Sequence, residues 1–254
     1  MHQLHAIEMG EGKGTPVVFL HGFGGTAAGW HAVQTAISAD HPTLAFDLPG
    51  HGASLDYPDA VTARHFAQAV VEGLNRRDIP RVHLVGHSMG GATAALVAAF
   101  AAEKVASLTL LAPGGFGPDI NGRLLRHYAA ARTYDALQVA LEGMFGWRNP
   151  VPEEMIRRDV DLRRIPGQIE RLDAILARMM KDGLQGTIPR DFLQAFAMPV
   201  TVAWGRLDNV LPVYQSEGLP PRFSIHRFDG AGHMLVEEIP GEVIRLISTT
   251  VRTG

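Results

Sequence analysis

The sequence contains no cysteine among its 254 residues. This absence excludes disulfide bonds, zinc sites built from cysteine thiolates and a cysteine nucleophile. The 12 histidines are scattered singly, without a His-Glu-x-x-His pair or a histidine-rich tract. Because a metal site in such a chain would need clustered histidines or carboxylates, we expect no bound metal.

The sequence also lacks a long apolar run and a large excess of charge. Its longest apolar run, Ala92–Ala102, is too short to cross a bilayer, which takes about 20 residues. The first residues contain no positively charged segment followed by an apolar stretch, so we expect no secretory signal and a cytoplasmic location. The net charge of -3, without a basic cluster, argues against a nucleic-acid partner. Hydrophobic residues make up 46% and charged residues 19%, which is typical of a globular protein.

The first half of the sequence alternates short apolar runs with helical patterns. Buried strands separated by helices predict a parallel sheet with right-handed crossovers and helices on both faces. The apolar runs are Val17–His21, Thr43–Asp47, Val82–Val85 and Leu108–Leu111. The helical patterns cover about residues 26–38, 62–77 and 90–102.

This alternation is interrupted over residues 114–198, where the pattern is helical and irregular. Strand patterns return at Val200–Trp204 and Phe223–Phe228, before a last helix at about 240–251. A structureless loop of that length is implausible inside a compact protein. We therefore predict an α/β core formed by residues 1–113 and 199–254, with residues 114–198 as a helical cap.

A Gly-x-Ser-x-Gly pentapeptide, Gly86–Gly90, lies between an expected strand and an expected helix. A nucleophile at the tip of a sharp strand-to-helix turn has a strained backbone, and small residues on either side make room for it. The following helix would direct backbone N–H groups and partial positive charge towards this turn. The motif alone is a weak signal, but its strand–turn–helix setting indicates Ser88 as a nucleophile.

A serine nucleophile needs a general base, and His233 is the candidate. It lies in a glycine-rich loop after the last expected strand. The imidazole in turn needs a carboxylate that fixes its tautomer and stabilises its charged form. Asp208, directly after another expected strand, gives the chain order Ser, Asp, His. Asp119 is the rival acid, whereas Asp229 is expected to be a turn residue.

Acyl transfer also requires hydrogen-bond donors for the oxyanion. The segment HGFGG follows the first expected strand, and its glycines let the backbone approach a substrate closely. We predict that the backbone N–H groups of Phe23 and Met89 form this oxyanion hole. His21 is expected to hold the loop by hydrogen bonds, and the segment DLPGHG at residues 47–52 is expected to be structural.

Four segments, HGFGG, DLPGHG, GHSMGG and GRLDNVLP…GAGHM, together resemble the motifs of the α/β-hydrolase family in order and spacing. The resemblance covers nearly the whole chain. It implies an eight-stranded, mostly parallel sheet with helices on both faces and a helical cap inserted between strands 6 and 7. It also implies Ser88, Asp208 and His233 as the catalytic triad, and Phe23 and Met89 as oxyanion donors.

A narrower similarity lies in VASLTLLAPGGFGPDINGRLL, residues 105–125. This segment is similar to the hydrolase-like domain of acetoin dehydrogenase acyltransferase-type subunits. We expect no lipoyl domain ahead of residue 1. The His-x-x-x-Asp-Gly motif of lipoyl acyltransferases is absent, since the stretch that begins at His226 is one residue short. We therefore expect no acyl transfer to lipoamide or coenzyme A.

These residues predict a serine hydrolase that cleaves a small to medium, mainly apolar carboxylic ester, thioester or lactone through an acyl-enzyme. We expect no metal or organic cofactor, and no partner other than this small molecule; no membrane or nucleic acid is needed, and the oligomeric state stays open. Candidates for the pocket wall are the large apolar residues of the cap, namely Phe116, Leu124, Phe145, Trp147 and Met179.

Two alternatives stay open. A C–C bond hydrolase of dienoic ring-cleavage products would share the triad, but would add polar groups to hold a dienolate, for which His87 and Met89 do not argue. A ligand receptor or interaction module could keep the fold with residual hydrolysis. Very slow turnover with tight product binding would indicate that second alternative.

Overall fold

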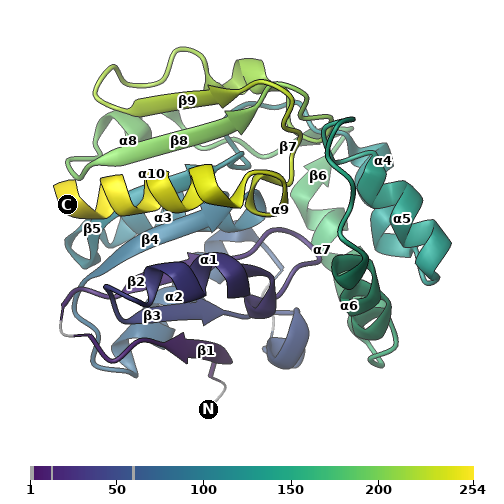
Figure 1. Cartoon of the computed structure of the whole chain (residues 1–254), viewed down its shortest axis with the longest axis horizontal. Coiled ribbons are helices and arrows are strands. Elements are labelled where there is room, and N and C mark those ends of the chain that lie inside the picture. Colours follow the sequence, from purple (N-terminus) through teal and green to yellow (C-terminus); the bar gives the residue numbers. More distant parts are fainter. Residues whose placement is uncertain (1–2, 13, 59–60) are drawn as a thin grey trace.

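The computed structural model describes residues 3–12, 14–58 and 61–254. A seven-stranded sheet forms the centre of this part of the chain, in the order β1-β3-β2-β4-β5-β8-β9 (Figure 1). Neighbouring strands are parallel, except that β1 runs antiparallel to β3. The strands are β1 (Ala6–Met9), β2 (Val17–Leu20), β3 (Thr43–Phe46), β4 (Val82–His87), β5 (Val105–Leu111), β8 (Val200–Gly205) and β9 (Ser224–Phe228).

The inner strands β2, β4, β5 and β8 are buried along their whole length. Burial on both faces explains why their sequences are nearly continuous apolar runs rather than alternating patterns. The edge strand β9 is only partly buried, and its sequence accordingly includes His226 and Arg227. Each apolar run predicted to be a strand is a strand in the structure.

Helices cover both faces of this sheet. Helix α1 (His31–Ile37) packs against α10 (Pro240–Thr253) on one face, and α2 (Ala63–Asn75) packs against α3 (Met89–Phe100) on the other (Figure 1). The short helices are η1 (Ala27–Trp30), η2 (Gly52–Ser54), η3 (Ala102–Lys104), η4 (Val213–Ser216) and α9 (Leu235–Glu238). Because the strands are parallel, the loops after β4, β8 and β9 meet at one edge of the sheet.

Helices also fill the segment between β5 and β8. Helices α4 to α7 pack against one another beyond the carboxyl ends of the strands, whereas α8 contacts α3 (Figure 1). The elements of this segment are α4 (Gly122–Ala130), α5 (Tyr134–Glu142), α6 (Glu153–Arg163), α7 (Gln168–Met179), β6 (Met180–Lys181), β7 (Leu184–Gln185) and α8 (Arg190–Gln194).

The sheet has seven strands among the described residues, one fewer than the family resemblance implies. Strands β1 and β9 form its two edges, and the helical segment follows the fifth strand in chain order rather than the sixth. The eighth strand rests on the resemblance alone, and no apolar run in the sequence corresponds to it.

The hairpin β6–β7 is a further feature of the segment between β5 and β8, and no apolar run in the sequence predicts it. Its turn residues, Asp182 and Gly183, have φ values of 53° and 81°. An Asp-Gly pair in this left-handed conformation is the strongest short-range signal for a hairpin. Each strand has only two residues, so no alternating pattern accompanies the signal.

The turn between β4 and α3 packs backbone directly against backbone. A Cβ atom on Gly90 would lie 2.1 Å from the Leu20 carbonyl oxygen, and one on Gly86 would lie 2.4 Å from the Gly90 carbonyl oxygen. Between these glycines, Ser88 has a φ of 53°, which is strained for a residue with a side chain. The two motif glycines are therefore required by close approach, and they hold the serine at the tip of the turn.

We predict that Gly90→Ala lowers the free energy of unfolding by about 3 kcal/mol, because overpacked backbone sites lose that much. The control is Gly241→Ala in the first turn of α10, where a Cβ meets no atom within 4 Å. Alanine favours helix there, so the control should be as stable as the wild type or slightly more so. Urea unfolding followed by circular dichroism measures both, and equal stability of the two variants would contradict the prediction.

Candidate active site

Ser88 lies at the junction of the sheet and α3, and the backbone on both sides holds it. Its N–H donates to the Leu111 carbonyl at 2.9 Å, and its carbonyl accepts from Gly114 N–H at 2.9 Å. Ser88 is also the residue that precedes the first turn of α3. Its hydroxyl is therefore placed by main-chain contacts with β5 and the loop that follows it.

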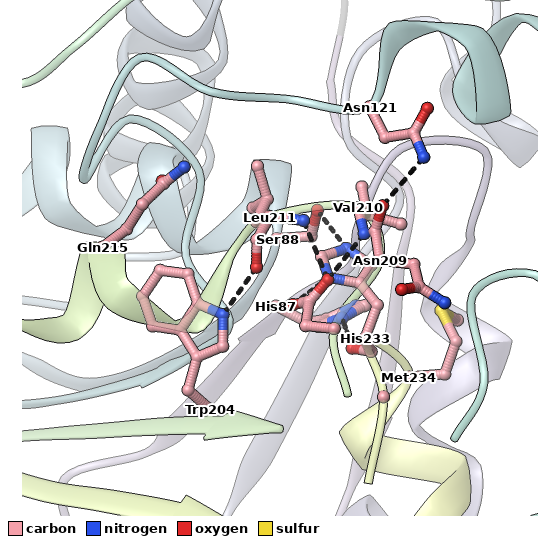
Figure 2. A network of polar contacts seen from close by, with 12 residues as sticks. His87, Ser88, Asn121, Trp204, Asn209, Val210, Leu211, Gln215, His233 and Met234 are labelled. Carbon is pink, nitrogen blue, oxygen red and sulfur yellow. Dashed lines mark hydrogen bonds and ion pairs between the residues drawn. The ribbon is translucent and has the colours of Figure 1, made fainter. Parts of the chain in front are cut away.

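A chain of hydrogen bonds connects Ser88, His233 and Asp208, three residues from three different loops. The Nε2 atom of His233 lies 2.9 Å from the Ser88 hydroxyl oxygen, and its Nδ1 atom lies 2.8 Å from an Asp208 carboxylate oxygen. All three side chains are buried. Figure 2 shows Ser88 and His233 side by side at the centre of a polar network. In this geometry a histidine can take a proton from a serine hydroxyl.

Asp208 is held in place by the backbone that follows it. One carboxylate oxygen accepts from the N–H groups of Val210 and Leu211, each at 2.8 Å, and the other oxygen faces His233. The Leu211 carbonyl in turn accepts from the Trp204 indole N–H (Figure 2). Both carboxylate oxygens thus have hydrogen-bond partners, which fixes the orientation of the acid towards His233.

The other two acids considered from the sequence lie elsewhere. Asp119 is exposed and accepts a hydrogen bond from the Tyr214 hydroxyl. Asp229 is exposed and forms an ion pair with Arg206 at 2.9 Å. The structure therefore brings Asp208, and neither of these residues, to the His233 ring.

The neighbouring His87 supports the loop that carries His233. Its Nε2 atom lies 2.8 Å from the His233 carbonyl oxygen, to which it donates. Burial is the main cause that lowers the pKa of His87 to about 3, and the adjacent His233 lowers it further. The His87 ring is therefore neutral, and it positions the His233 backbone without competing for protons.

The glycine-rich loop after β2 runs directly beside Ser88. A Cβ atom on Gly22 would lie 3.2 Å from the Ser88 Cβ atom. Phe23 lines the cavities at Ser88, and Met89 is the first residue of α3. The structure therefore places both predicted oxyanion donors next to the serine, and their role stays a prediction.

Two buried histidines hold this loop as acceptors. The Nε2 atom of His21 accepts from Leu48 N–H at 2.9 Å, and that of His51 accepts from Gly24 N–H at 3.1 Å. Burial is the main cause that lowers the pKa of both rings. Only a neutral ring has a nitrogen that can accept, so the low pKa values and the hydrogen bonds agree.

Glu238 organises the His233 loop, although no motif in the sequence marks it. Its carboxylate accepts from Gly232 N–H and Met234 N–H, the residues on either side of His233. It also accepts from Gly146 N–H at 2.8 Å and from the Asn149 side chain at 2.7 Å. One carboxylate therefore joins the His233 loop to the helical segment. In the sequence it is only an acid shortly after the histidine. Acids are common in the first turn of any helix, so this position does not mark a function.

An apolar cavity of about 290 Å³ opens beside Ser88. Of the five predicted wall residues, only Met179 lines it; Phe116 and Phe145 are buried in the hydrophobic core, and Trp147 is 74% exposed. Leu124 packs against the core and lines neither cavity at Ser88. The apolar residues that do line the larger cavity are Phe23, Ala63, Phe66, Met89, Ala92, Leu96, Ile120, Leu125, Met179, Ile188, Pro189, Val210 and Leu211.

The wall prediction departs from the structure for a physical reason. Size and apolarity do not distinguish a side chain that fills the core from one that lines a cavity. Trp147 instead lies at the surface, with the Arg148 guanidinium 4.4 Å from its ring centroid. Much of the wall comes from α2, α3 and the loop after β8, which belong to the core rather than to residues 114–198.

A second, smaller cavity of about 50 Å³ also reaches Ser88. Its wall includes His233 and a group of polar side chains, namely Thr26, Arg158, Asp159 and Glu237. Burial is the main cause that raises the pKa of Glu237 to about 7; Asp159 and Glu238 add to the shift, and Arg158 opposes it. Glu237 is therefore partly protonated near neutral pH.

Among the described residues, no three histidine, aspartate or glutamate side chains are grouped so that they could hold a metal ion. Within the same residues, no helix has the length and apolar character needed to cross a membrane.

We predict that Glu238→Gln lowers the free energy of unfolding by about 2 kcal/mol, because some of the N–H groups it accepts from lose their partner. Catalytic turnover should fall as well, since His233 loses its support on both sides. The control is Glu242→Gln, whose carboxylate lies on the surface of α10 beside Arg245. Thermal unfolding and activity measured on both variants test this, and matching values would count against the role of Glu238.

The raised pKa of Glu237 predicts a pH dependence of stability. Between about pH 4.5 and 7, the folded chain binds this proton more tightly than the unfolded chain, so the free energy of unfolding falls as the pH rises. Glu237→Gln has no such proton, and its stability should decline less across this window. Urea unfolding at several pH values tests the difference, and parallel profiles for variant and wild type would refute it.

A family model described as the alpha/beta hydrolase family matches residues 17–246. The dihydrolipoyllysine-residue acetyltransferase component of an acetoin cleaving system from Pseudomonas putida is 32% identical over 240 residues, which is 94% of this chain and 64% of the relative. The chain thus spans less than two thirds of the length of that relative.

Two further similarities concern hydrolases. A 2-hydroxy-6-oxononadienedioate/2-hydroxy-6-oxononatrienedioate hydrolase from Cupriavidus pinatubonensis is 30% identical, over 91% of this chain and 84% of the relative. The solved structure of a meta-cleavage product hydrolase from Pseudomonas fluorescens IP01 has a TM-score of 0.86 at 21% identity, over 98% of this chain and 94% of that one. That likeness concerns the fold. With a family model that matches residues 17–246, this chain belongs to the alpha/beta hydrolase family.

Proposed function

We propose that this hydrolase cleaves small to medium, mainly apolar carboxylic esters through a covalent acyl-enzyme on Ser88. The observation that supports this most directly is the hydrogen-bond chain from Ser88 through His233 to Asp208, which ends beside an apolar cavity. A serine hydroxyl needs an adjacent base to become a nucleophile, and the 2.9 Å contact with His233 supplies one.

The reaction would proceed in two steps. His233 takes the Ser88 proton as the serine oxygen attacks the ester carbonyl, and Asp208 stabilises the charged imidazole. The backbone N–H groups of Phe23 and Met89 stabilise the oxyanion. His233 returns the proton to the leaving alcohol, and it then activates a water that releases the acid. No metal or organic cofactor takes part in this scheme.

The substrate range follows from the cavity. A volume of about 290 Å³ with mostly apolar walls suits an acyl or alcohol part of a few to several carbons. Thioesters and lactones meet the same requirements, because they present the same kind of carbonyl. In this proposal, residues 114–198 act as a cap that contributes part of the cavity wall, including Met179.

A second candidate function is hydrolysis of a C–C bond in a dienoic ring-cleavage product. The relative from Cupriavidus pinatubonensis, named for that kind of substrate, favours it. The two reactions share the Ser88, His233 and Asp208 machinery. They differ in the substrate group that must be held, which is a dienol carboxylate in the second case.

The proposal predicts that the wild type hydrolyses p-nitrophenyl esters from acetate to octanoate, and that Ser88→Ala loses about 10⁴-fold or more in kcat/KM. The control is Ser248→Ala on α10, which lines neither cavity at Ser88 and should keep full activity. The acyl chain length that gives the highest kcat/KM reports the size of the cavity.

The same preparations should be tested on a dienoic ring-cleavage product, whose absorbance falls on cleavage. Efficient loss of that absorbance with no ester turnover would replace ester hydrolysis by C–C hydrolysis. A folded wild type that turns over neither compound would reject both functions and favour a ligand receptor.

A further inference from the structure

Several residues that line the small cavity beside Ser88 have buried polar atoms that lack partners. The Trp30 indole nitrogen, the Arg158 Nε atom, one Asp159 oxygen and one Glu237 oxygen have no hydrogen-bond partner among the described residues. Trp30 comes from η1, Arg158 and Asp159 from α6, and Glu237 from α9. Buried polar atoms almost always have partners, so four such residues around one cavity favour a group that is supplied from outside.

Neighbouring contacts place Asp159 and Arg158 beside each other. The second Asp159 oxygen accepts from the Tyr128 hydroxyl at 2.7 Å. The Arg158 Nε atom lies 3.8 Å from the free Asp159 oxygen, which is too long for a hydrogen bond. The Arg158 guanidinium lies close to Gly29, since a Cβ atom built on this glycine would be 3.9 Å from it. The hydrogen bond from Tyr128 therefore orients the Asp159 carboxylate, and its free oxygen lies near Arg158.

The mixture of charges selects against an ionic group. A carboxylate would face the acids Asp159 and Glu237, and an ammonium group would face Arg158. The free atoms include the donors of Trp30 and Arg158 and the acceptor of Asp159. A hydroxyl both donates and accepts, so it satisfies such a set without adding charge.

The size of the cavity supports the same group. Its volume of about 50 Å³ is much smaller than the volume of about 290 Å³ of the apolar cavity. A small substituent such as a hydroxyl therefore suits it better than a bulky group. The cavity shares Ser88, Phe23 and Leu125 with the apolar cavity, so one molecule can reach both.

We infer that this cavity is a specificity subsite for a hydroxyl group of the substrate. The substrate would be an ester with an apolar part in the larger cavity and a hydroxyl near the scissile carbonyl, held by Trp30, Arg158 and Asp159. This inference rests on the proposed function, because Ser88 is the point where the two cavities meet.

A binding measurement tests the subsite without any turnover. The Ser88→Ala variant, labelled with ¹⁵N, is titrated with methyl 3-hydroxybutanoate and with methyl 3-methylbutanoate, which differ only by a hydroxyl in place of a methyl group. A second pair, 2-hydroxypropyl butanoate and 2-methylpropyl butanoate, places the same exchange in the alcohol part. The chain has 3 tryptophans, so the Trp30 indole signal is readily assigned with Trp30→Phe.

The subsite predicts a downfield shift of the Trp30 indole proton with the hydroxyl compound of at least one pair, and with neither methyl compound. It also predicts tighter binding of that hydroxyl compound by about tenfold, as expected for hydrogen bonds to a charged partner. Equal binding within both pairs, with no indole shift, would mean that water alone fills the cavity and would overturn the inference. Stronger binding of monomethyl succinate would overturn it as well, because the cavity would then select a carboxylate.

Matched arginine variants separate the subsite from general effects of charge. Arg158→Gln should abolish the preference for the hydroxyl compound. Arg157→Gln removes the preceding arginine of α6, which pairs with Glu153 at the surface, and should preserve the preference. Loss of the preference in both variants, or in neither, would contradict the role of Arg158.

Kinetics on the wild type then distinguish failure of the inference from failure of the proposed function. Ester turnover with a kcat/KM ratio near one within both pairs would remove the subsite and leave the ester hydrolase intact. A Trp30 shift on binding without turnover of any ester would keep the subsite and reject the ester reaction.

Discussion

The close packing of backbone at the turn between β4 and α3 is the constraint on which the site depends. Gly90 lies against the Leu20 carbonyl, so α3 begins in direct contact with β2. This contact leaves Ser88 in a strained conformation, and hydrogen bonds to Leu111 and Gly114 hold it there. The hydroxyl therefore has a position set by the sheet, and the loops from β2, β8 and β9 need only converge on that point.

Buried ionisable groups around this point are held mainly by backbone atoms. The rings of His21 and His87 stay neutral because burial lowers their pKa, so they serve as hydrogen-bonding groups rather than charges. Asp208 and Glu238 instead accept several N–H groups each, which compensates the burial of a carboxylate. His233 lies between these two acids, one of which orients its ring and the other its loop.

The sequence predicts the strands and helices around the site better than the residues that line its apolar cavity. Strands, helices on both faces and a helical segment at residues 114–198 follow from apolar periodicity, and the serine from its strand–turn–helix setting. The wall residues do not follow from apolar periodicity. Phe116 and Phe145 have the apolar character of a pocket lining but fill the core. Met89, predicted only as an oxyanion donor, and Leu211, for which no role was predicted, both line the cavity.

The sequence by itself determined the fold class and the order of Ser88, Asp208 and His233, because each rests on a local pattern: an apolar run, a turn and the residue that follows it. Only the tertiary structure decided which acid reaches the histidine and which side chains gather in the small cavity. Trp30, Arg158 and Glu237 come from helices far apart in the chain, and no local periodicity connects them. Their proximity depends on where η1, α6 and α9 lie around the small cavity, which is a property of the assembled core.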